Sequence, residues 1–173
     1  MATYIALLRG VNVGGRKLPM ADLRATFDAL GHTEVRTYIQ SGNVVFRAGS
    51  GSKAAVRSAI EKAIARDSGL DVTVLLRTPA EIASVMVRNP FGPDAYVTFL
   101  DDRPAAARIE AIDPGLYAPD EFEVDGREVF VRCPNGYGRT KINNTFFERK
   151  LATGATTRNW NTAKLLHEWA TER

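Results

Sequence analysis

Hydrophobic and polar positions along this chain switch between strand-like and helix-like spacing in a regular order. Residues 4–8 form a continuous apolar run, which is typical of a strand buried on both faces. Met20, Leu23, Phe27 and Leu30 then recur at the spacing of one helix face. The pattern predicts that the chain begins with a buried strand and an amphipathic helix.

Four further elements complete the first half. Residues 35–39 alternate between polar and apolar, and an apolar run returns after the turn-forming residues 40–43. Ser52 is placed to cap a second helix that ends near Gly69, and residues 72–76 form another apolar run. The resulting order, βαββαβ, is that of the ferredoxin-like fold.

A linking helix separates this half from a second one with the same element order. Residues 78–81 read Thr-Pro-Ala-Glu, which has capping-box spacing with proline at the first helical position, and predict a helix over residues 79–88. Asp125-Gly126 lies between two apolar runs and predicts a β-hairpin. The second half is predicted to contain strands at 96–100, 121–124, 127–132 and 155–157, helices at 104–112 and 141–151, and a tail helix at 162–169.

The element order predicts the fold class. We expect an α+β fold with two ferredoxin-like (βαββαβ) subdomains in tandem plus a C-terminal helix. The N-terminal subdomain is expected over residues 1–77, the linking helix over 78–93, and the C-terminal subdomain with its tail helix over 94–173. No residue-level repeat accompanies this order, so the duplication rests on the order alone.

The predicted topology brings two polar segments of the first half together. In a βαββαβ sheet with spatial order 4-1-3-2, the first two strands run in the same direction, so the segments that follow them share an edge. The alternative to a ligand site is a structural loop in which Asn12 and Asn43 bond backbone groups of their own turns. The predicted anion site at this edge consists of Arg9, Asn12, Arg16, Lys17, Gln40, Ser41 and Asn43.

A second candidate site follows the third strand of the second half. Its glycines let the backbone approach a ligand, and a helix predicted to start at Lys141 adds N–H donors for an anion. The alternative is a structural glycine turn with solvated cations. The candidate residues are Gly136, Tyr137, Gly138, Arg139 and Lys141, with Arg158 and Asn159 from the last strand.

Familiar motifs do not account for these loops. The segment 136–141 lacks the third glycine of a dinucleotide fingerprint and a parallel βαβ context, and the chain has no Walker A sequence. Residues 41–46 lack the stacking pair of aromatic residues found in ferredoxin-like RNA binders. His32, His167 and Cys133 do not have the spacing of a metal site, so no metal is expected.

Composition narrows the class of protein rather than the function. The chain has 173 residues, 45% of them hydrophobic and 25% charged, with a net charge of +3, which permits nucleic-acid binding without indicating it. A single cysteine suits a reducing cytoplasm. Without a signal-peptide pattern at the N-terminus or an apolar run near the ~20 residues of a membrane helix, we expect a cytoplasmic protein that contacts no membrane.

Four ordered segments of the chain resemble a known family. They are residues 8–15 (Leu-Arg-Gly-Val-Asn-Val-Gly-Gly), 38–46 (Tyr-Ile-Gln-Ser-Gly-Asn-Val-Val-Phe), 137–141 (Tyr-Gly-Arg-Thr-Lys) and 155–162 (Ala-Thr-Thr-Arg-Asn-Trp-Asn-Thr). Together they resemble a bacterial domain-of-unknown-function family numbered 1697. The resemblance implies an α+β fold of two ferredoxin-like subdomains and supplies no activity.

The sequence therefore predicts a binding function and leaves catalysis open. We expect the loops to bind an anionic small molecule, such as a nucleotide or another phosphorylated metabolite. Phosphoryl transfer would need carboxylates for Mg²⁺, and no such set is evident. No cofactor is identified. The alternatives are a nucleic-acid-binding module, whose binding would depend steeply on salt, and a protein–protein adaptor without catalysis.

Overall fold

The computed structural model describes residues 1–12, 15–38 and 42–172 of the chain. It is a mixed α+β structure with two four-stranded antiparallel sheets. The chain divides into two units, Met1–Ala83 together with Leu165–Arg173, and Ser84–Lys164. The tail of the chain therefore belongs with the first unit, although the sequence pattern places it beside the second.

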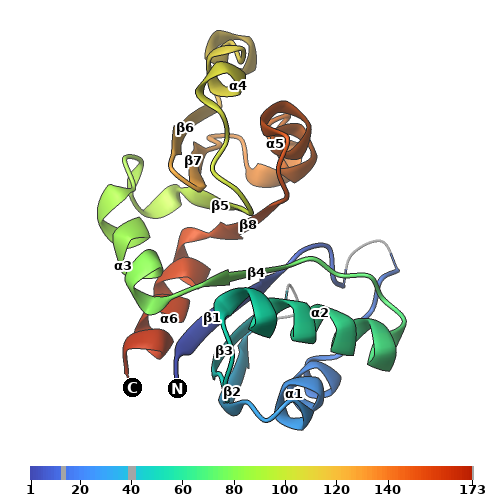
Figure 1. The fold of residues 1–173 in the computed structure, drawn as a ribbon. Helices are drawn as coiled ribbons and strands as arrows, with labels where there is room; N and C mark the ends of the chain where they lie inside the picture. Colours follow the sequence, from blue (N-terminus) through green and yellow to red (C-terminus); the bar gives the residue numbers. More distant parts are fainter. Residues whose placement is uncertain (13–14, 39–41, 173) are drawn as a thin grey trace. The chain divides into compact units, whose positions relative to one another are not determined.

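The first unit contains the first sheet, with strand order β2-β3-β1-β4. This is the spatial order assumed in deriving the shared edge, and all neighbouring strands are antiparallel. Helices α1 and α2 cover one face of the sheet (Figure 1). The elements are β1 (Thr3–Leu8), α1 (Met20–Ala29), β2 (Thr33–Tyr38), β3 (Asn43–Arg47), α2 (Lys53–Ser68) and β4 (Val74–Arg77).

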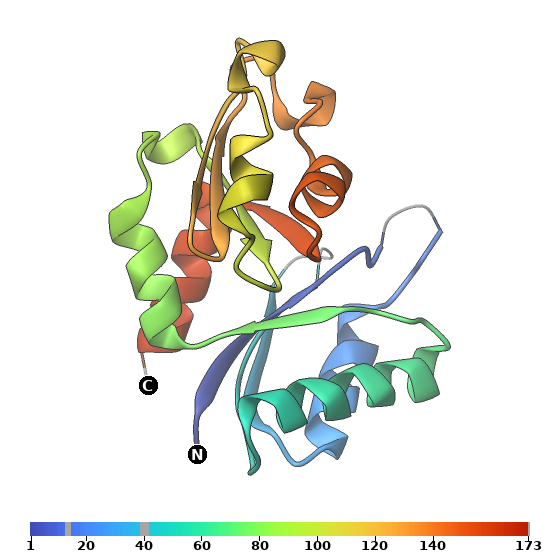
Figure 2. The same cartoon turned by 45° about the horizontal axis from the view of Figure 1, so that its top comes forward.

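The second unit contains the second sheet, whose order, β6-β7-β5-β8, matches that of the first. Figure 2 shows α4 and α5 near this sheet. The helix α3 (Pro79–Arg88) links the sheets in sequence, and α6 (Trp160–Thr171) ends the chain. The remaining elements are β5 (Tyr96–Leu100), α4 (Ala106–Glu110), β6 (Glu121–Asp125), β7 (Glu128–Arg132), α5 (Asn144–Leu151), β8 (Ala155–Asn159) and the 3₁₀ turns η1 (Gly92–Asp94), η2 (Pro114–Tyr117) and η3 (Tyr137–Arg139).

Each sheet buries one face against its own pair of helices. In the first unit, Leu8 and Phe46 from the strands pack with Phe27 of α1, whose ring meets Phe46 edge-on at 5.0 Å. In the second unit, Val129 lies in one cluster with Phe147 of α5. The period-2 alternation of the strands and the helical spacing of their partners create these two cores.

Local signals read from the sequence fix several element boundaries. Ser52 caps α2, because its hydroxyl accepts a hydrogen bond from the backbone N–H of Ala55 at 3.2 Å. Thr78 and Glu81 form the predicted capping box, in which each side chain accepts from the other residue's backbone N–H. Gly126, with φ +63, lies in the short turn between β6 and β7. The capping and hairpin predictions are confirmed.

One predicted boundary bears on function and is wrong. The helix expected from Lys141 begins at Asn144, after the cap residue Asn143. The cap is Asn143, whose backbone is extended and whose side chain accepts a hydrogen bond from the N–H of Phe146 at 3.1 Å. The segment 136–141 is therefore a loop with a 3₁₀ turn and not the N-terminus of a helix.

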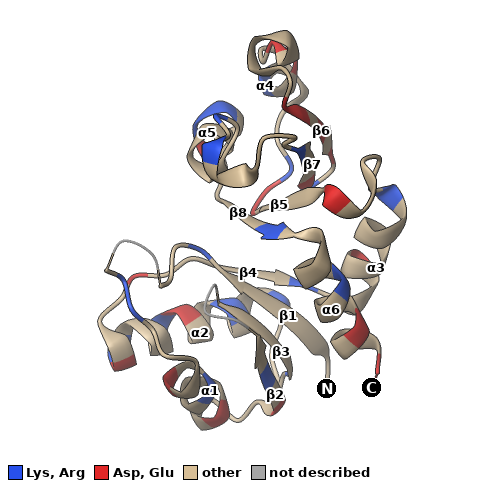
Figure 3. Cartoon of the chain, turned by 180° about the vertical axis from the view of Figure 1, so that it is seen from behind, with Lys and Arg blue, Asp and Glu red and all other residues tan. Residues whose placement is uncertain are grey.

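Two further observations concern the surface. Along the ribbon of each unit, segments with basic residues alternate with segments with acidic residues (Figure 3). No helix in the described part of the chain has the length and apolar character needed to span a bilayer.

Candidate functional site

The edge predicted in the first unit exists as a backbone arrangement. The N–H of Leu8 donates to the carbonyl of Gly42 at 2.9 Å, which places the end of β1 beside the segment that follows β2. The N–H of Arg9 donates to the carbonyl of Thr73 at 2.9 Å. The loop after β1 is thus tied to both neighbouring segments.

The polar side chains of this loop are engaged with the backbone. The amide of Asn12 donates to the carbonyl of Leu18 at 3.0 Å and accepts from the N–H of the same residue at 2.8 Å. Arg16 donates to the carbonyls of Gly10 and Asp71 at 3.0 and 2.6 Å. These contacts are those of the structural alternative, in which the loop satisfies its own backbone groups.

The other described residues predicted for this site lie in different surroundings. Asn43 is fully buried, and its amide donates to the carbonyl of Tyr38 at 2.9 Å. Lys17 is exposed and lines a cavity of about 550 Å³ between α1 and α2, whereas Arg9 is half-buried and does not line it. Gln40 and Ser41 lie outside the described residues.

The second predicted edge lies at the start of β5. There Tyr96 is paired with Val131 of β7 on one side and with Asn159 of β8 on the other. The ends of β7 and β8 therefore flank the beginning of β5, and the segment 133–141 continues from β7. A loop, a strand start and a helix start meet at this edge.

Tyr137 anchors the loop to the sheet. Its ring stacks on that of Tyr96, with centroids 4.8 Å apart and an angle of 28° between the planes. Its hydroxyl donates to Oγ1 of Thr157 at 3.0 Å, and this oxygen also meets Thr98 and Asn144. One side chain of the loop is thus held by packing and by a polar network.

Arg139 and Lys141 remain available for a ligand. Both are exposed, and neither side chain makes a hydrogen bond or ion pair with another described residue. They line a cavity of about 260 Å³ together with Asp120 and Gly136. Gly136 has φ +93, a conformation that glycine adopts readily, and Gly138 lies exposed within η3.

Arg158 is not brought to these two cations. It is 5% exposed, and its guanidinium donates to Oγ1 of Thr156 and to the carbonyl of Thr157 at 2.7 and 2.9 Å. Successive side chains of a strand point to opposite faces, and Thr157 faces Tyr137. Arg158 consequently lies on the other face of the sheet, away from the anchored side of the loop.

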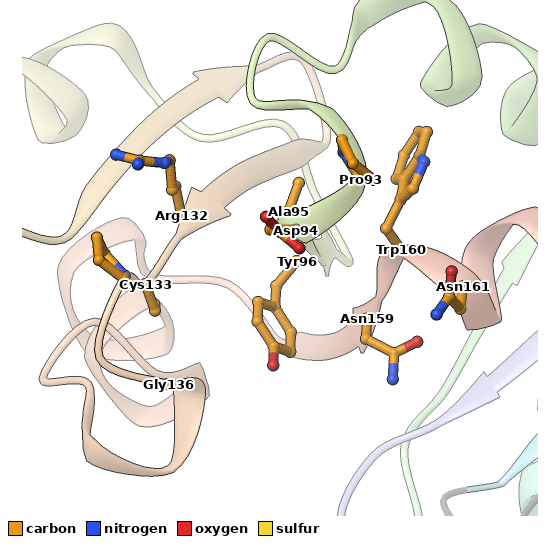
Figure 4. Close-up of a pocket in the computed structure, with 11 residues that line it drawn as sticks. Pro93, Asp94, Ala95, Tyr96, Arg132, Cys133, Gly136, Asn159, Trp160 and Asn161 are labelled. Atoms are coloured by element: carbon orange, nitrogen blue, oxygen red, sulfur yellow. The ribbon is translucent and has the colours of Figure 1, made fainter.

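A larger cavity, of about 560 Å³, also has Gly136 in its lining. Figure 4 shows that its walls come from the start of β5, from the segment after β7 and from the start of α6. Its lining residues are Pro93, Asp94, Ala95, Tyr96, Arg132, Cys133, Pro134, Gly136, Asn159, Trp160 and Asn161.

The polar groups of this cavity are of several kinds. Asn159 caps α6, because its Oδ1 accepts from the N–H of Thr162 at 2.8 Å, and its Nδ2 makes no hydrogen bond to another described residue. The side chains of Asp94 and Asn161 are exposed and have no partner among the described residues. Arg132 is paired with Glu121 at 3.0 Å. The cavity offers donors and acceptors without a strong excess of charge.

Cys133 lies in this wall as a neutral thiol. Burial raises the pKa of the Cys133 thiol, an effect that a hydrogen bond with Thr140 opposes and the nearby Asp120 reinforces. The residue also packs against the core cluster of the second unit. A reactive cysteine requires a lowered thiol pKa, so these surroundings favour a packing role.

Sequence reasoning missed most of the larger cavity. Asp94 precedes β5, and Tyr96 looks like an ordinary strand aromatic in the sequence. The signal that could have located this cavity was the topology of the second sheet. In that topology, the start of the first strand of the second half lies beside the ends of its third and fourth strands. The run Asn159-Trp160-Asn161, an aromatic residue between two amides at that edge, marks the place.

Comparisons with known proteins identify a family and a fold. A model of the family described as "Protein of unknown function (DUF1697)" matches residues 1–130, and the chain belongs to this family. No curated protein matches the chain. The solved structure of the conserved bacterial protein SP0830 from Streptococcus pneumoniae is similar, with a TM-score of 0.75 and 22% sequence identity over 98% of each chain. At this identity the similarity shows the fold alone.

Proposed function

We propose that this member of the DUF1697 family binds an anionic small molecule, a nucleotide or another phosphorylated metabolite, through the loop at residues 136–141. The observation that carries the proposal is the pair Arg139 and Lys141. Both side chains line one cavity, and neither has a partner among the described residues. In a folded protein, unpaired cations on the wall of a cavity favour an anion there.

The geometry of the loop supports a phosphate in particular. A cavity of about 260 Å³ has room for a phosphate group. Arginine can contact two phosphate oxygens at once, and lysine adds a point charge. Asp120 on the same wall already accepts a hydrogen bond from Thr140. Tyr137 restrains the loop before a ligand arrives, which lowers the entropic cost of binding.

The distribution of charge favours a small molecule over a nucleic acid. Nucleic-acid binders concentrate lysine and arginine on one face, and their affinity comes largely from contacts with many phosphates. Along the ribbon of the second unit, basic and acidic residues alternate instead (Figure 3). Two cations at one cavity suit a single phosphorylated molecule.

Two wider expectations form part of the same proposal. We infer that each unit is a ferredoxin-like subdomain, because each has the order βαββαβ and the same arrangement of strands. The proposed boundaries remain 1–77 and 94–173, with residues 78–93 as the link. The single cysteine favours a reducing cytoplasm as the site of action. A ligand site at the edge of the first unit stays a prediction.

The proposal is tested by removing the two cations together. The double variant Arg139→Ala/Lys141→Ala should bind ribose 5-phosphate at least about tenfold more weakly than the unchanged protein in isothermal titration calorimetry. Its melting temperature should stay close to that of the unchanged protein, since exposed unpaired charges contribute little to folding.

A matched control separates local contacts from bulk charge. Arg149 and Lys150 are exposed at the end of α5 and line neither cavity, so Arg149→Ala/Lys150→Ala removes the same charge elsewhere in the same unit. This control should keep the affinity within about twofold at moderate salt. Equal weakening in both double variants would show that net charge, and not the loop, attracts the ligand.

A further inference from the structure

We propose that the ligand is a nucleotide whose base and ribose occupy the larger cavity while its phosphate contacts Arg139 and Lys141. This inference rests on the proposed function and names the chemical class of the ligand. Gly136 lines both the 560 Å³ cavity and the 260 Å³ cavity. The two cavities therefore share a lining residue, which is the observation behind a ligand with one aromatic and one anionic part.

Two aromatic side chains suit the larger cavity to a planar ring. Tyr96 and Trp160 line it and are each partly exposed. One face of the Tyr96 ring is covered by Tyr137, so the remaining part of Tyr96 faces the cavity and is held in place by that stack. Fixed aromatic rings stack on nucleobases with little loss of conformational freedom.

The polar groups of the cavity match the hydrogen-bonding edges of a nucleoside. The carboxylate of Asp94 is unpartnered among the described residues and can accept bonds from ribose hydroxyls, as acidic residues do in dinucleotide sites. The Nδ2 group of Asn159 and the amide of Asn161 can meet the ring nitrogens and carbonyls of a base. A bare phosphate could accept from the two amides, but it has no hydroxyl groups of a ribose to donate to Asp94.

The charged residues of the two cavities indicate which part of the ligand each cavity would hold. In the larger cavity Arg132 already pairs with Glu121, and Asp94 is negative. A phosphate is therefore poorly matched to this cavity and well matched to the neighbouring one, where two unpaired cations lie. The volume of about 560 Å³ falls within the usual range for small-molecule sites, roughly 300–1,000 Å³.

The experiment compares ligands that differ by the base alone. Adenosine, guanosine, cytidine and uridine 5′-monophosphates and ribose 5-phosphate are titrated into the protein by calorimetry. At least one nucleotide should bind about tenfold more tightly than ribose 5-phosphate, because stacking of a base is lost in the sugar phosphate. If none of the four binds more tightly than ribose 5-phosphate, the inference is overturned.

Single substitutions test where the base and the ribose of the nucleotide bind. Trp160→Leu should weaken nucleotide binding about tenfold and leave ribose 5-phosphate binding unchanged. Asp94→Ala removes an exposed side chain that has no partner among the described residues, so it tests the site even if the Trp160 variant fails to fold. It should weaken nucleotide binding severalfold, whereas Asp102→Ala, at an exposed carboxylate outside both cavities, should not. Unchanged nucleotide affinity in Asp94→Ala and in a folded Trp160 variant would refute the placement.

Tryptophan fluorescence reports directly whether a base binds next to Trp160. The chain has two tryptophans, and Trp160 is the one that lines the cavity. In a Trp169→Phe background, nucleotide should change the emission of Trp160, and ribose 5-phosphate should not. Binding of ribose 5-phosphate that depends on Arg139 and Lys141, without any preference for nucleotides, would leave the proposed function standing and overturn this inference. Absence of binding by every probe would overturn both.

Discussion

The loop after β1 and the loop after β7 contain the same kinds of residue and use them differently. Each has at least one glycine with positive φ and at least two basic residues. In the first loop, Arg16 donates hydrogen bonds to two backbone carbonyls, and the side chain of Asn12 makes two hydrogen bonds with the backbone of Leu18. In the second, Arg139 and Lys141 make no side-chain bond to another described residue.

The difference teaches that composition alone cannot assign a binding role. Backbone carbonyls compete with ligands for the same donors, so an arginine that closes a loop is not available for an anion. The second loop uses an aromatic residue, Tyr137, as its anchor instead. Its cations are left for another partner. The following predictions test whether the first loop is structural and the second is functional.

The largest expected effect comes from a glycine of the first unit. In Gly42→Ala the new Cβ would lie 2.7 Å from both Cβ of Leu8 and Cγ2 of Val11, at φ +82. We expect the free energy of unfolding to fall by about 3 kcal/mol, since backbone strain and overpacking both oppose the side chain. Urea denaturation followed by circular dichroism measures the loss.

Gly136→Ala is the matched variant in the second loop. Gly136 has φ +93, and a Cβ there would meet no heavy atom within 4 Å. Only the strain of the backbone applies, so the expected loss is about 1 kcal/mol. A loss for Gly42→Ala no larger than that for Gly136→Ala would contradict the close packing seen at the first edge.

The two hydrogen bonds between the side chain of Asn12 and the backbone of Leu18 should stabilise the folded protein. Asn12→Ala removes both hydrogen bonds to Leu18 and places alanine at φ +58. The expected cost is about 2 kcal/mol. Asn12→Gly keeps the backbone conformation and removes the side-chain bonds, so the two variants separate strain from hydrogen bonding in thermal denaturation.

Asn135 provides the comparison in the second loop. It is exposed and has no side-chain partner among the described residues, so Asn135→Ala should change the stability by less than about 0.5 kcal/mol. If Asn12→Ala were equally harmless, the loop after β1 would not depend on the hydrogen bonds of Asn12. Its polar residues would then again be candidates for a ligand.

The sequence predicted elements and edges better than side-chain roles. Hydrophobic periodicity and caps such as Thr78 with Glu81 are local, and both sheets have the predicted strand order. The helix predicted from Lys141 starts at Asn144 instead, because Asn143 is its cap, and Thr140 is bonded to Asp120, 20 residues away in the sequence. Tertiary contacts of this kind override local propensity.

The candidate site was predictable only in part. The topology correctly brought the end of β7 near the end of β8, but an edge does not specify a face of the sheet, and Arg158 and Thr157 are successive residues of a strand. The partners of Arg16 at Gly10 and Asp71 could not be foreseen, since they depend on the path of the loop. Sequence shows which donors exist, and only the fold shows which are already in use.

The last prediction concerns Tyr137, the residue that anchors the second loop. Tyr137→Phe removes the hydrogen bond from the tyrosine hydroxyl to Thr157 and keeps a ring that can stack on Tyr96. Thr157 retains its contacts with Thr98 and Asn144, so no buried oxygen is left without a partner. The free energy of unfolding should fall by about 1 kcal/mol or less.

The same variant distinguishes an anchor from a purely structural residue. If Tyr137 positions Arg139 and Lys141, its loss should weaken binding of a phosphorylated probe severalfold in calorimetry, because the freed loop must be ordered again at each binding event. Tyr38→Phe changes the same kind of residue outside both cavities, where the ring packs against Trp169, and serves as the control. A loss of stability without any loss of affinity would show that the hydroxyl of Tyr137 supports the sheet alone. The two loops would then differ in the hydrogen bonds that their side chains make, but neither would be positioned in advance for a ligand.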